Sequence, residues 1–392
     1  MKKKITKSSS GFQWLSITLI ISLLTIFPQQ PAFAIPLSDS ANPVNAAAMK
    51  LVAFCSNPKT GLDAQAVATL VDYVLEPKSN KEAALPKFQD ATGAYYEFDT
   101  RINFSNFLQY AYNSKVPSVL MSPSSLRFSV WTDLPGEIQR MPGNWKLPVP
   151  AGKTIIIYGS EHEGITPDLN TGVYYEYGLK RTVILLNYKG KQALISVAKQ
   201  LEISDVGKKG FVLGKDDDWN YYYSGELGSA QQGLGWVKSY IYDLFSVGVY
   251  VESGAKSSSV RSASFHWIRA GWSGINFVRT DHIIKGMKRR AKTFKTILES
   301  PNLPSPKQIA ATHQSLSALP KNDLVERYTT LQQARQSSAA QSGKINANEM
   351  KKSDSYANIS KEQMIQELML EHLKITLGKP SLLEKKLVLR NN

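Results

Sequence analysis

The chain has 392 residues, among them 47 Lys or Arg, 32 Asp or Glu, five His and a single Cys. One cysteine excludes an intrachain disulfide, so stability must come from a packed core, and the length allows one to three domains. The net charge of +15 indicates an anionic partner or surface only if the positive charge is concentrated in one place.

Residues 1–34 have the three parts of a secretory signal peptide. A cationic start, MKKKITK, precedes an apolar run from Trp14 to Phe27, and Ala32-Phe33-Ala34 forms a small-residue cleavage site. The apolar run is shorter than the roughly 17 to 25 residues that a membrane-spanning helix needs. We therefore predict cleavage after Ala34, export to the periplasm or the cell exterior, and no transmembrane span after cleavage.

Residues 46–112 are expected to form an N-terminal helical and aromatic-rich segment. Stretches 46–54 and 62–75 have the apolar spacing of two short helices, and a Glu-Pro pair ends the second. The following stretch is rich in Tyr and Phe, and its last part has the pattern of a capped helical turn. Cys55 has no charged side chain within three residues, which favours a buried and unreactive thiol.

Residues 113–299 are expected to form the main α+β domain. After a proline-rich connection around one strand at 126–131, runs such as TIIIYGSE and RTVILLNY have the composition and length of strands. A Lys-Gly-Lys sequence between two such runs predicts a hairpin turn. Five to seven strands between about 126 and 225, with no helix between them, predict an antiparallel sheet that is curled or sandwich-like.

The last part of this domain, about 234–299, is expected to be helical and to pack on the sheet. The apolar residues of 236–249 repeat at helical spacing, although the end of that stretch could equally pair as a strand. Residues 260–278 follow the same spacing, and a third helix at 281–299 ends before a Ser-Pro pair. The predicted fold class is therefore α+β, with an antiparallel sheet packed by C-terminal helices and preceded by short N-terminal helices.

Residues 300–392 are expected to form a flexible helical tail, partly disordered. Two segments within 306–335 have weak helical patterns, and the polar stretch 337–358 is predicted to be mobile. A capping-box pattern at Ser360 begins an amphipathic segment.

The stretch 269–277, RAGWSGINF, is close to the Gly-x-Ser-x-Gly turn on which many hydrolases carry a nucleophilic serine. That turn needs a glycine two residues after the serine, whereas Gly274 follows Ser273 directly. The preceding residues also lack the alternation of a strand. We therefore interpret Gly271 and Gly274 as small residues on a helix face that permit close packing.

The five histidines provide the candidates for catalysis, and none has the paired spacing of a metal site. Glu161, His162 and Glu163 form the densest titratable cluster, and a His between two carboxylates could act as an acid or a base. His266 and His282 lie on neighbouring elements and could meet in space. A secreted hydrolase with a His/carboxylate site is thus the alternative, but we expect a non-enzymatic protein.

No metal or cofactor is expected. The acidic turn at 216–218 lacks the alternating ligand spacing of a calcium loop and is interpreted as a solvated hairpin turn. No glycine pattern of a nucleotide site follows a predicted strand. The aromatic run WNYYY after the turn has rings on both faces, which predicts burial of the second face beneath helices or its display to a sugar or a protein.

The excess positive charge is concentrated at 279–295, where seven basic residues accompany one Asp, whereas residues 35–278 are almost neutral. Apolar residues of this predicted amphipathic helix cover one arc, and Arg290 is the basic residue within that arc. Five basic residues lie on the opposite arc: Lys285, Lys288, Arg289, Lys292 and Lys295. This arc is either a solvated face or a surface for anionic lipid, acidic polysaccharide or an acidic envelope protein; nucleic acid is disfavoured by export. The expected function is that of an exported, envelope-associated binding or interaction protein.

Overall fold

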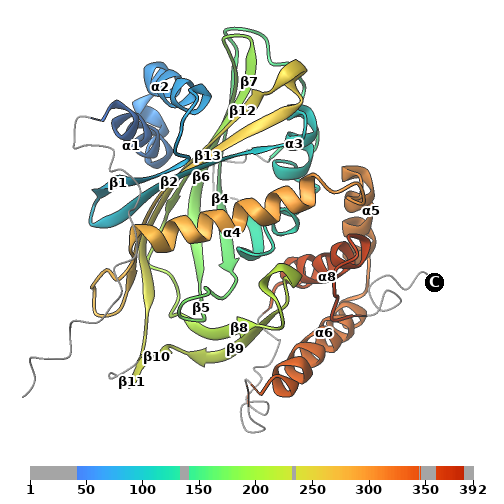
Figure 1. The fold of residues 1–392 in the computed structure, drawn as a ribbon. Helices are drawn as coiled ribbons and strands as arrows, with labels where there is room; N and C mark the ends of the chain where they lie inside the picture. The colour runs from blue at the N-terminus through green and yellow to red at the C-terminus, as the bar shows by residue number, and fades with distance from the viewer. Residues whose placement is uncertain (1–41, 133–140, 232–234, 344, 346–358, 384–392) are drawn as a thin grey trace, which may run out of the picture. The chain divides into compact units, whose positions relative to one another are not determined.

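The centre of the fold is an antiparallel sheet with helices around it (Figure 1). The described residues are 42–132, 141–231, 235–343, 345 and 359–383 of a computed structural model. The predicted signal peptide and most of the stretch predicted to be mobile lie outside them. The strands are β1 (Glu82–Phe88), β2 (Ala91–Thr100), β3 (Leu126–Thr132), β4 (Thr154–Ile165), β5 (Val173–Tyr174), β6 (Glu176–Tyr188), β7 (Lys191–Gln200), β8 (Lys208–Val212), β9 (Tyr221–Leu227), β10 (Ser229–Gln231), β11 (Gly235–Val237), β12 (Tyr240–Ser253) and β13 (Ser259–Gly271).

Eight of these strands form one sheet in the order β1-β2-β13-β12-β7-β6-β4-β3, and each neighbouring pair is antiparallel. β5, β8 and β9 form a second sheet, and β10 and β11 form a third. The predicted α+β class with an antiparallel sheet packed by helices is confirmed. The main sheet extends beyond the predicted range of about 126–225, because it also contains β1 and β2 from the segment expected to be helical and aromatic-rich, and β12 and β13, which were expected as helices.

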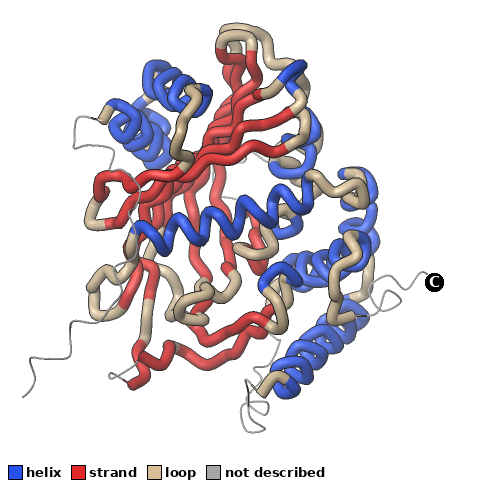
Figure 2. Tube along the Cα trace, in the orientation of Figure 1, coloured by secondary structure: helices blue, strands red, loops and turns tan. Residues whose placement is uncertain are grey.

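Helices cover both faces of the eight-stranded sheet (Figure 2). They are α1 (Pro43–Ser56), α2 (Ala64–Leu75), α3 (Phe104–Ala111), α4 (Thr280–Leu298), α5 (Pro306–Ser317), α6 (Lys321–Gln341) and α8 (Lys361–Thr376). α1 and α2 bury Leu51 and Leu70 against Phe265 and Trp267 on one face. The remaining helices share a second core with the other face, in which Phe294 of α4 is buried.

Local sequence determines where the two N-terminal helices begin. The Asn42 side chain accepts a hydrogen bond from the backbone N–H of Val44 at 2.9 Å, and Asp63 accepts one from Ala66 at 2.8 Å. Both are side chains preferred at helix N-caps, because they satisfy backbone donors that the first turn leaves free. The two predicted N-terminal helices are therefore confirmed, and Cys55 at the end of α1 is buried as expected.

The helices predicted at 236–249 and 260–278 are wrong. Most of these residues belong to β12 and β13, two central strands that pair with each other along their length, while 236–237 belong to β11 and 272–278 follow β13 as a turn and loop. Val247 and Val249 of β12 face α1 and α2, while Tyr250 packs in the core on the opposite side. A strand that is buried on both faces loses the clean alternation of a half-exposed strand, so its apolar residues can imitate helical spacing.

The third predicted helix is confirmed as α4, which lies across the face opposite α1 and α2 (Figure 1). Its Phe294 ring lies 6.2 Å from that of Phe98 on β2 and 6.1 Å from that of Phe107 on α3, measured between ring centroids. These contacts hold the helix against the sheet through the apolar arc that the sequence indicated.

Packing continues across the domain boundaries suggested at 112/113 and 299/300. Phe107 of α3 contacts Tyr250 of β12, with ring centroids 4.9 Å apart. Beyond residue 299, α6 and α8 bury Tyr328 and Leu368 in the core shared with α4. The described helices of the segment expected to be a flexible tail are thus part of the packed structure. Among the described residues, no helix combines the length and apolar character required to cross a membrane.

The stretch 269–277 is neither a nucleophile turn nor a helix face. β13 ends at Gly271, and a turn follows in which Phe277 N donates to Ala270 O at 2.9 Å. Ser273 and Gly274 have φ of +51° and +77°, left-handed values that a helix does not contain. The helical interpretation of both glycines is therefore corrected to a tight turn at the end of a strand.

The hairpin predicted around the acidic turn is present as the pair β8 and β9. Trp219, Tyr221 and Tyr222 are buried, which confirms burial of the aromatic run over display. The acidic turn is more than a solvated connection, because Asp216 and Asp217 form ion pairs with basic side chains of α4.

Candidate functional site

A cavity of about 550 Å³ lies on the α4 side of the eight-stranded sheet. Strands β3, β4, β6, β7, β12 and β13 contribute to its lining, as do helices α4, α5 and α8 and the loop after α3. Serine hydroxyls, ionisable groups and apolar side chains such as Met121 and Leu244 share the lining. The volume lies within the roughly 300–1,000 Å³ that is typical of small-molecule sites.

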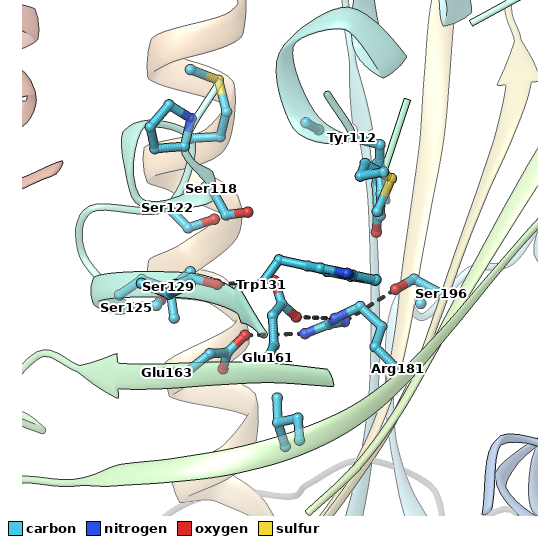
Figure 3. Close-up of a pocket in the computed structure, with 18 of the residues that line it drawn as sticks. Tyr112, Ser118, Ser122, Ser125, Ser129, Trp131, Glu161, Glu163, Arg181 and Ser196 are labelled. Atoms are coloured by element: carbon cyan, nitrogen blue, oxygen red, sulfur yellow. Dashed lines mark hydrogen bonds and ion pairs between the residues drawn. The ribbon is translucent and has the colours of Figure 1, made fainter. Parts of the chain in front are cut away.

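Arg181 of β6 is the centre of a charged group in this cavity (Figure 3). Its guanidinium donates to Glu163 at 3.0 Å, to the Ser196 hydroxyl at 3.1 Å and to Glu161. The Ser129 hydroxyl donates to the second oxygen of Glu161 at 2.9 Å. Strand geometry explains the arrangement: Glu161 and Glu163 are two residues apart on β4, so both face the cavity, and β6 is the adjacent antiparallel strand.

The carboxyl group of Glu163 changes its protonation near neutral pH. Burial and, next, the charge of Glu161 raise its pKa, Arg181 and Arg290 oppose the rise, and the net pKa is about 7. The cause is geometric, because one guanidinium is shared by two buried carboxyl groups that cannot both ionise without repulsion. At neutral pH these two carboxyl groups together therefore carry less than two negative charges.

A second guanidinium, that of Arg290 on α4, reaches the same cavity from the opposite side. It donates to the Tyr250 hydroxyl at 3.5 Å, and its charge helps to lower the pKa of that phenol despite the opposing effect of burial. The Tyr112 ring lies 5.6 Å from the Tyr250 ring, and both phenols interact electrostatically with the guanidinium. In the described part of the chain, no carboxylate is recorded within 4.0 Å of Arg290, unlike Arg181.

His266 of β13 also lines the cavity and is held neutral there. Burial lowers the pKa of its imidazole to about 3, and the positive charges of Arg290 and Arg181 contribute further. A neutral imidazole with so low a pKa is a weak proton acceptor at physiological pH. His266 can donate or accept a hydrogen bond to a bound molecule, but it is poorly suited to act as a general base.

Three of the five residues predicted for a hydrolase site meet in the cavity: Glu161, Glu163 and His266. His162 alternates with the two glutamates along β4 and faces away, where its side chain is 45% exposed and lies 3.9 Å from Glu176. His282 is on the first turn of α4 and is absent from the cavity lining. The structure therefore leaves His162 outside the cavity that contains Glu161 and Glu163, and His282 outside the cavity that contains His266.

The basic arc of α4 is largely paired with carboxylates of the same chain. Lys288 lies 2.5 Å from Glu82, and Lys285 lies 3.8 Å from Asp281. Arg289 and Lys292 bind the acidic turn, at 2.6 Å to Asp216 and 2.5 Å to Asp217. Lys295 is half-buried. The lysine pairs are solvent-exposed and individually weak, so they leave the binding prediction for this arc untested.

Sequence patterns did not identify Arg181, Tyr112 or Tyr250 as part of a site. Their partners come from strands and loops distant in the chain, and no short motif joins them. Arg290 did leave a signal, because it was the basic residue within the apolar arc of its helix. A charged residue at such a position must be paired, reach solvent or line a cavity, and Arg290 lines a cavity.

Comparison with known proteins adds little to this description. No model of a protein family matches the chain, and no curated protein matches it. Among solved structures, the human StarD13 (DLC2) lipid transfer and protein localization domain aligns at 10% identity, covering 59% of this chain and 98% of that domain. The TM-score of 0.25 is too low for this likeness to support an argument about fold or ligand.

Proposed function

We propose that the protein is an exported, non-enzymatic binding protein that holds one small amphipathic molecule in the cavity beneath α4. The observation that carries the proposal is the mixed lining: charged and hydroxyl groups around Arg181 share the space with apolar side chains such as Met121 and Leu244. Such a lining suits a molecule with one polar end and an apolar body. Export and association with the cell envelope are proposed from the N-terminal sequence.

A cavity-filling substitution tests the binding proposal. Ser246 lies on β12 and lines the cavity, so Ser246→Phe is expected to occupy the space that a ligand needs. Wild-type protein should bind the neutral fluorophore N-phenyl-1-naphthylamine saturably, and the variant should bind it about tenfold more weakly, or not at all. Ser315→Phe, on an exposed face of α5, is the matched control and should bind like the wild type. Equal binding by both variants would reject the cavity as the binding site.

A hydrolase remains the second candidate, because one observation favours it. Glu163, with a pKa of about 7, has the acidity of an effective acid–base catalyst at neutral pH. Against this, Glu161 is bound by Arg181 and Ser129, and His266 is a weak base. Turnover of p-nitrophenyl esters that Glu163→Gln abolishes, in a variant that still binds the fluorophore, would favour the hydrolase.

Export has its own test. The N-terminal sequence of protein secreted by the producing cells is expected to begin at Ile35. Protein that retains Met1 and stays with the cytoplasmic fraction would reject export without affecting the cavity proposal.

A further inference from the structure

We infer that the molecule bound in this cavity is an amphiphile with a single anionic group, and that Arg290 with the hydroxyl of Tyr250 binds that group. The inference rests on the proposed binding function and adds the chemical class of the ligand. It is argued from the charges that face the cavity, from the position of Arg290 and from the groups around it.

The two guanidiniums of the cavity differ in the number of carboxyl groups that they bind. Arg181 binds two carboxyl groups, Glu161 and Glu163, together with the Ser196 hydroxyl. Among the described residues, the partners of Arg290 are the Tyr250 hydroxyl, at the long distance of 3.5 Å, and the Phe294 ring at 5.7 Å. A guanidinium removed from water without a counter-ion is unfavourable, and an anion bound beside it would offset that cost.

The carboxyl groups of the cavity do not fully compensate Arg290. Glu161 and Glu163 are engaged by Arg181, and burial together with the charge of Glu161 raises the pKa of Glu163 to about 7. With Glu163 protonated and His266 neutral, the two guanidiniums of Arg181 and Arg290 share the single negative charge of Glu161 in this part of the cavity. Glu362, the other carboxylate of the lining, is paired with His313 at 3.1 Å.

The surroundings of Arg290 suit an oxyanion. The guanidinium can donate two parallel hydrogen bonds to a carboxylate or a related group, and the Tyr250 phenol can donate a third. Phe294, one turn further along α4, lines the cavity beside it and offers apolar contact to the body of a ligand. Arg290 is thus placed as an anchor at the border between polar and apolar parts of the lining.

The experiment compares decanoate with 1-decanol, which share an alkyl chain length and differ in charge, by calorimetry below the concentration at which either aggregates. Wild-type protein is expected to prefer decanoate by about tenfold or more, a ratio that corresponds to about 1.4 kcal/mol. Arg290→Gln should remove this preference and retain the binding of decanol. Lys292→Gln, an exposed cation on the same helix, is the matched control and should keep the preference.

The outcomes separate the two proposals. If Arg290→Gln keeps the preference for decanoate, the anion site is rejected while the cavity remains a binding site. If wild type binds neither compound nor N-phenyl-1-naphthylamine, the proposed function itself fails. Folding is checked by the melting temperature, which Arg290→Gln should maintain or raise because it removes a partly buried charge that has no carboxylate partner among the described residues. Arg290→Lys, which keeps the charge without the forked geometry, should show an intermediate preference.

Discussion

Glu163 shows how one position in a strand determines the chemistry of a side chain. Its carboxyl group shares Arg181 with Glu161, and burial raises its pKa from the usual 4.5 to about 7. In the folded protein the group keeps its proton between these pH values, whereas the unfolded chain releases it. Folding stability from this group is therefore fully present below pH 4.5 and is lost as the pH rises through about 7.

The prediction for Glu163→Gln follows from this loss of folding stability with rising pH. Glutamine cannot ionise, so the variant should lose less stability than the wild type between pH 5.5 and 7.5, as measured by melting temperature. A rise from 4.5 to about 7 corresponds to an effect on the order of 3 kcal/mol at most. Parallel curves for the two proteins would contradict the shared-guanidinium account.

His266 changes the folding stability with pH in the opposite direction, so its contribution must be distinguished from that of Glu163. Burial lowers its pKa from 6.5 to about 3, so the unfolded chain takes up a proton that the folded protein does not. The corresponding stability is present above pH 6.5 and is lost as the pH falls towards 3. The two effects on stability partly cancel between pH 4.5 and 6.5. The dependence of the wild-type melting temperature on pH must therefore be compared with that of a variant in which one of the two residues is changed.

The turn after β13 is an element whose stability depends on a close backbone contact. A Cβ atom added to Gly271 would lie 2.2 Å from the carbonyl oxygen of Ile275, so the backbone would have to move. Gly271→Ala should therefore destabilise the protein by about 2 kcal/mol or more in urea unfolding. Gly274→Ala, at a φ of +77° with open space around it, should cost about 1 kcal/mol, and Ser273→Ala almost nothing. Equal effects at 271 and 274 would contradict this account.

Helix α8 is held by a buried ionic group. Glu367 binds Arg127 of β3 at 2.9 Å and Arg335 of α6, and all three side chains are buried. Burial alone would raise the pKa of Glu367, but the two guanidiniums outweigh it and lower the pKa to about 2. The corresponding stability is present above the usual value of 4.5 and is lost as the pH falls through about 2.

Glu367→Gln should therefore cost about 3–5 kcal/mol in urea unfolding at pH 7, because it leaves two buried guanidiniums without a counter-ion. Glu362→Gln is the control on the same helix. Its carboxylate is 34% exposed and its partner is His313, so the expected loss is about 1 kcal/mol or less. A cost for Glu367→Gln no larger than that of the control would indicate that the ionic group does not hold α8.

The basic arc of α4 carries a separate prediction about surfaces. If it contacts anionic lipid, the triple change of Lys285, Lys288 and Lys292 to Gln should weaken binding to vesicles that contain phosphatidylglycerol at low ionic strength. The difference should vanish at about 1 M salt, where the Debye length is about 3 Å. Because these lysines are paired within the chain, the wild-type affinity is expected to be modest. Binding unchanged by the triple substitution at every salt concentration would reject the contact.

At the scale of the whole described fold, the cavity lies between one face of the eight-stranded sheet and the helices and loop that cover that face, which come from residues between 111 and 366. β4 brings Glu161 and Glu163, β3 brings Ser129, β6 brings Arg181, α4 brings Arg290, and α5 and α8 contribute His313 and Glu362. The helices after residue 299 thus complete the wall of the candidate site. Their removal is expected to affect both stability and ligand binding, so the site is tested in the full chain.

The sequence by itself determined the α+β class, the N-terminal helices, α4 and several strands, because caps, turns and one-sided apolar patterns depend on neighbours in the chain. It also indicated that Glu161, Glu163 and His266 were chemically notable, and that Arg290 was out of place. Only the tertiary structure decided that β12 and β13 are strands, since burial on both faces removes the alternation that identifies a strand. It alone placed Arg181 between two glutamates and Arg290 in a cavity, because those contacts join residues that no local pattern connects.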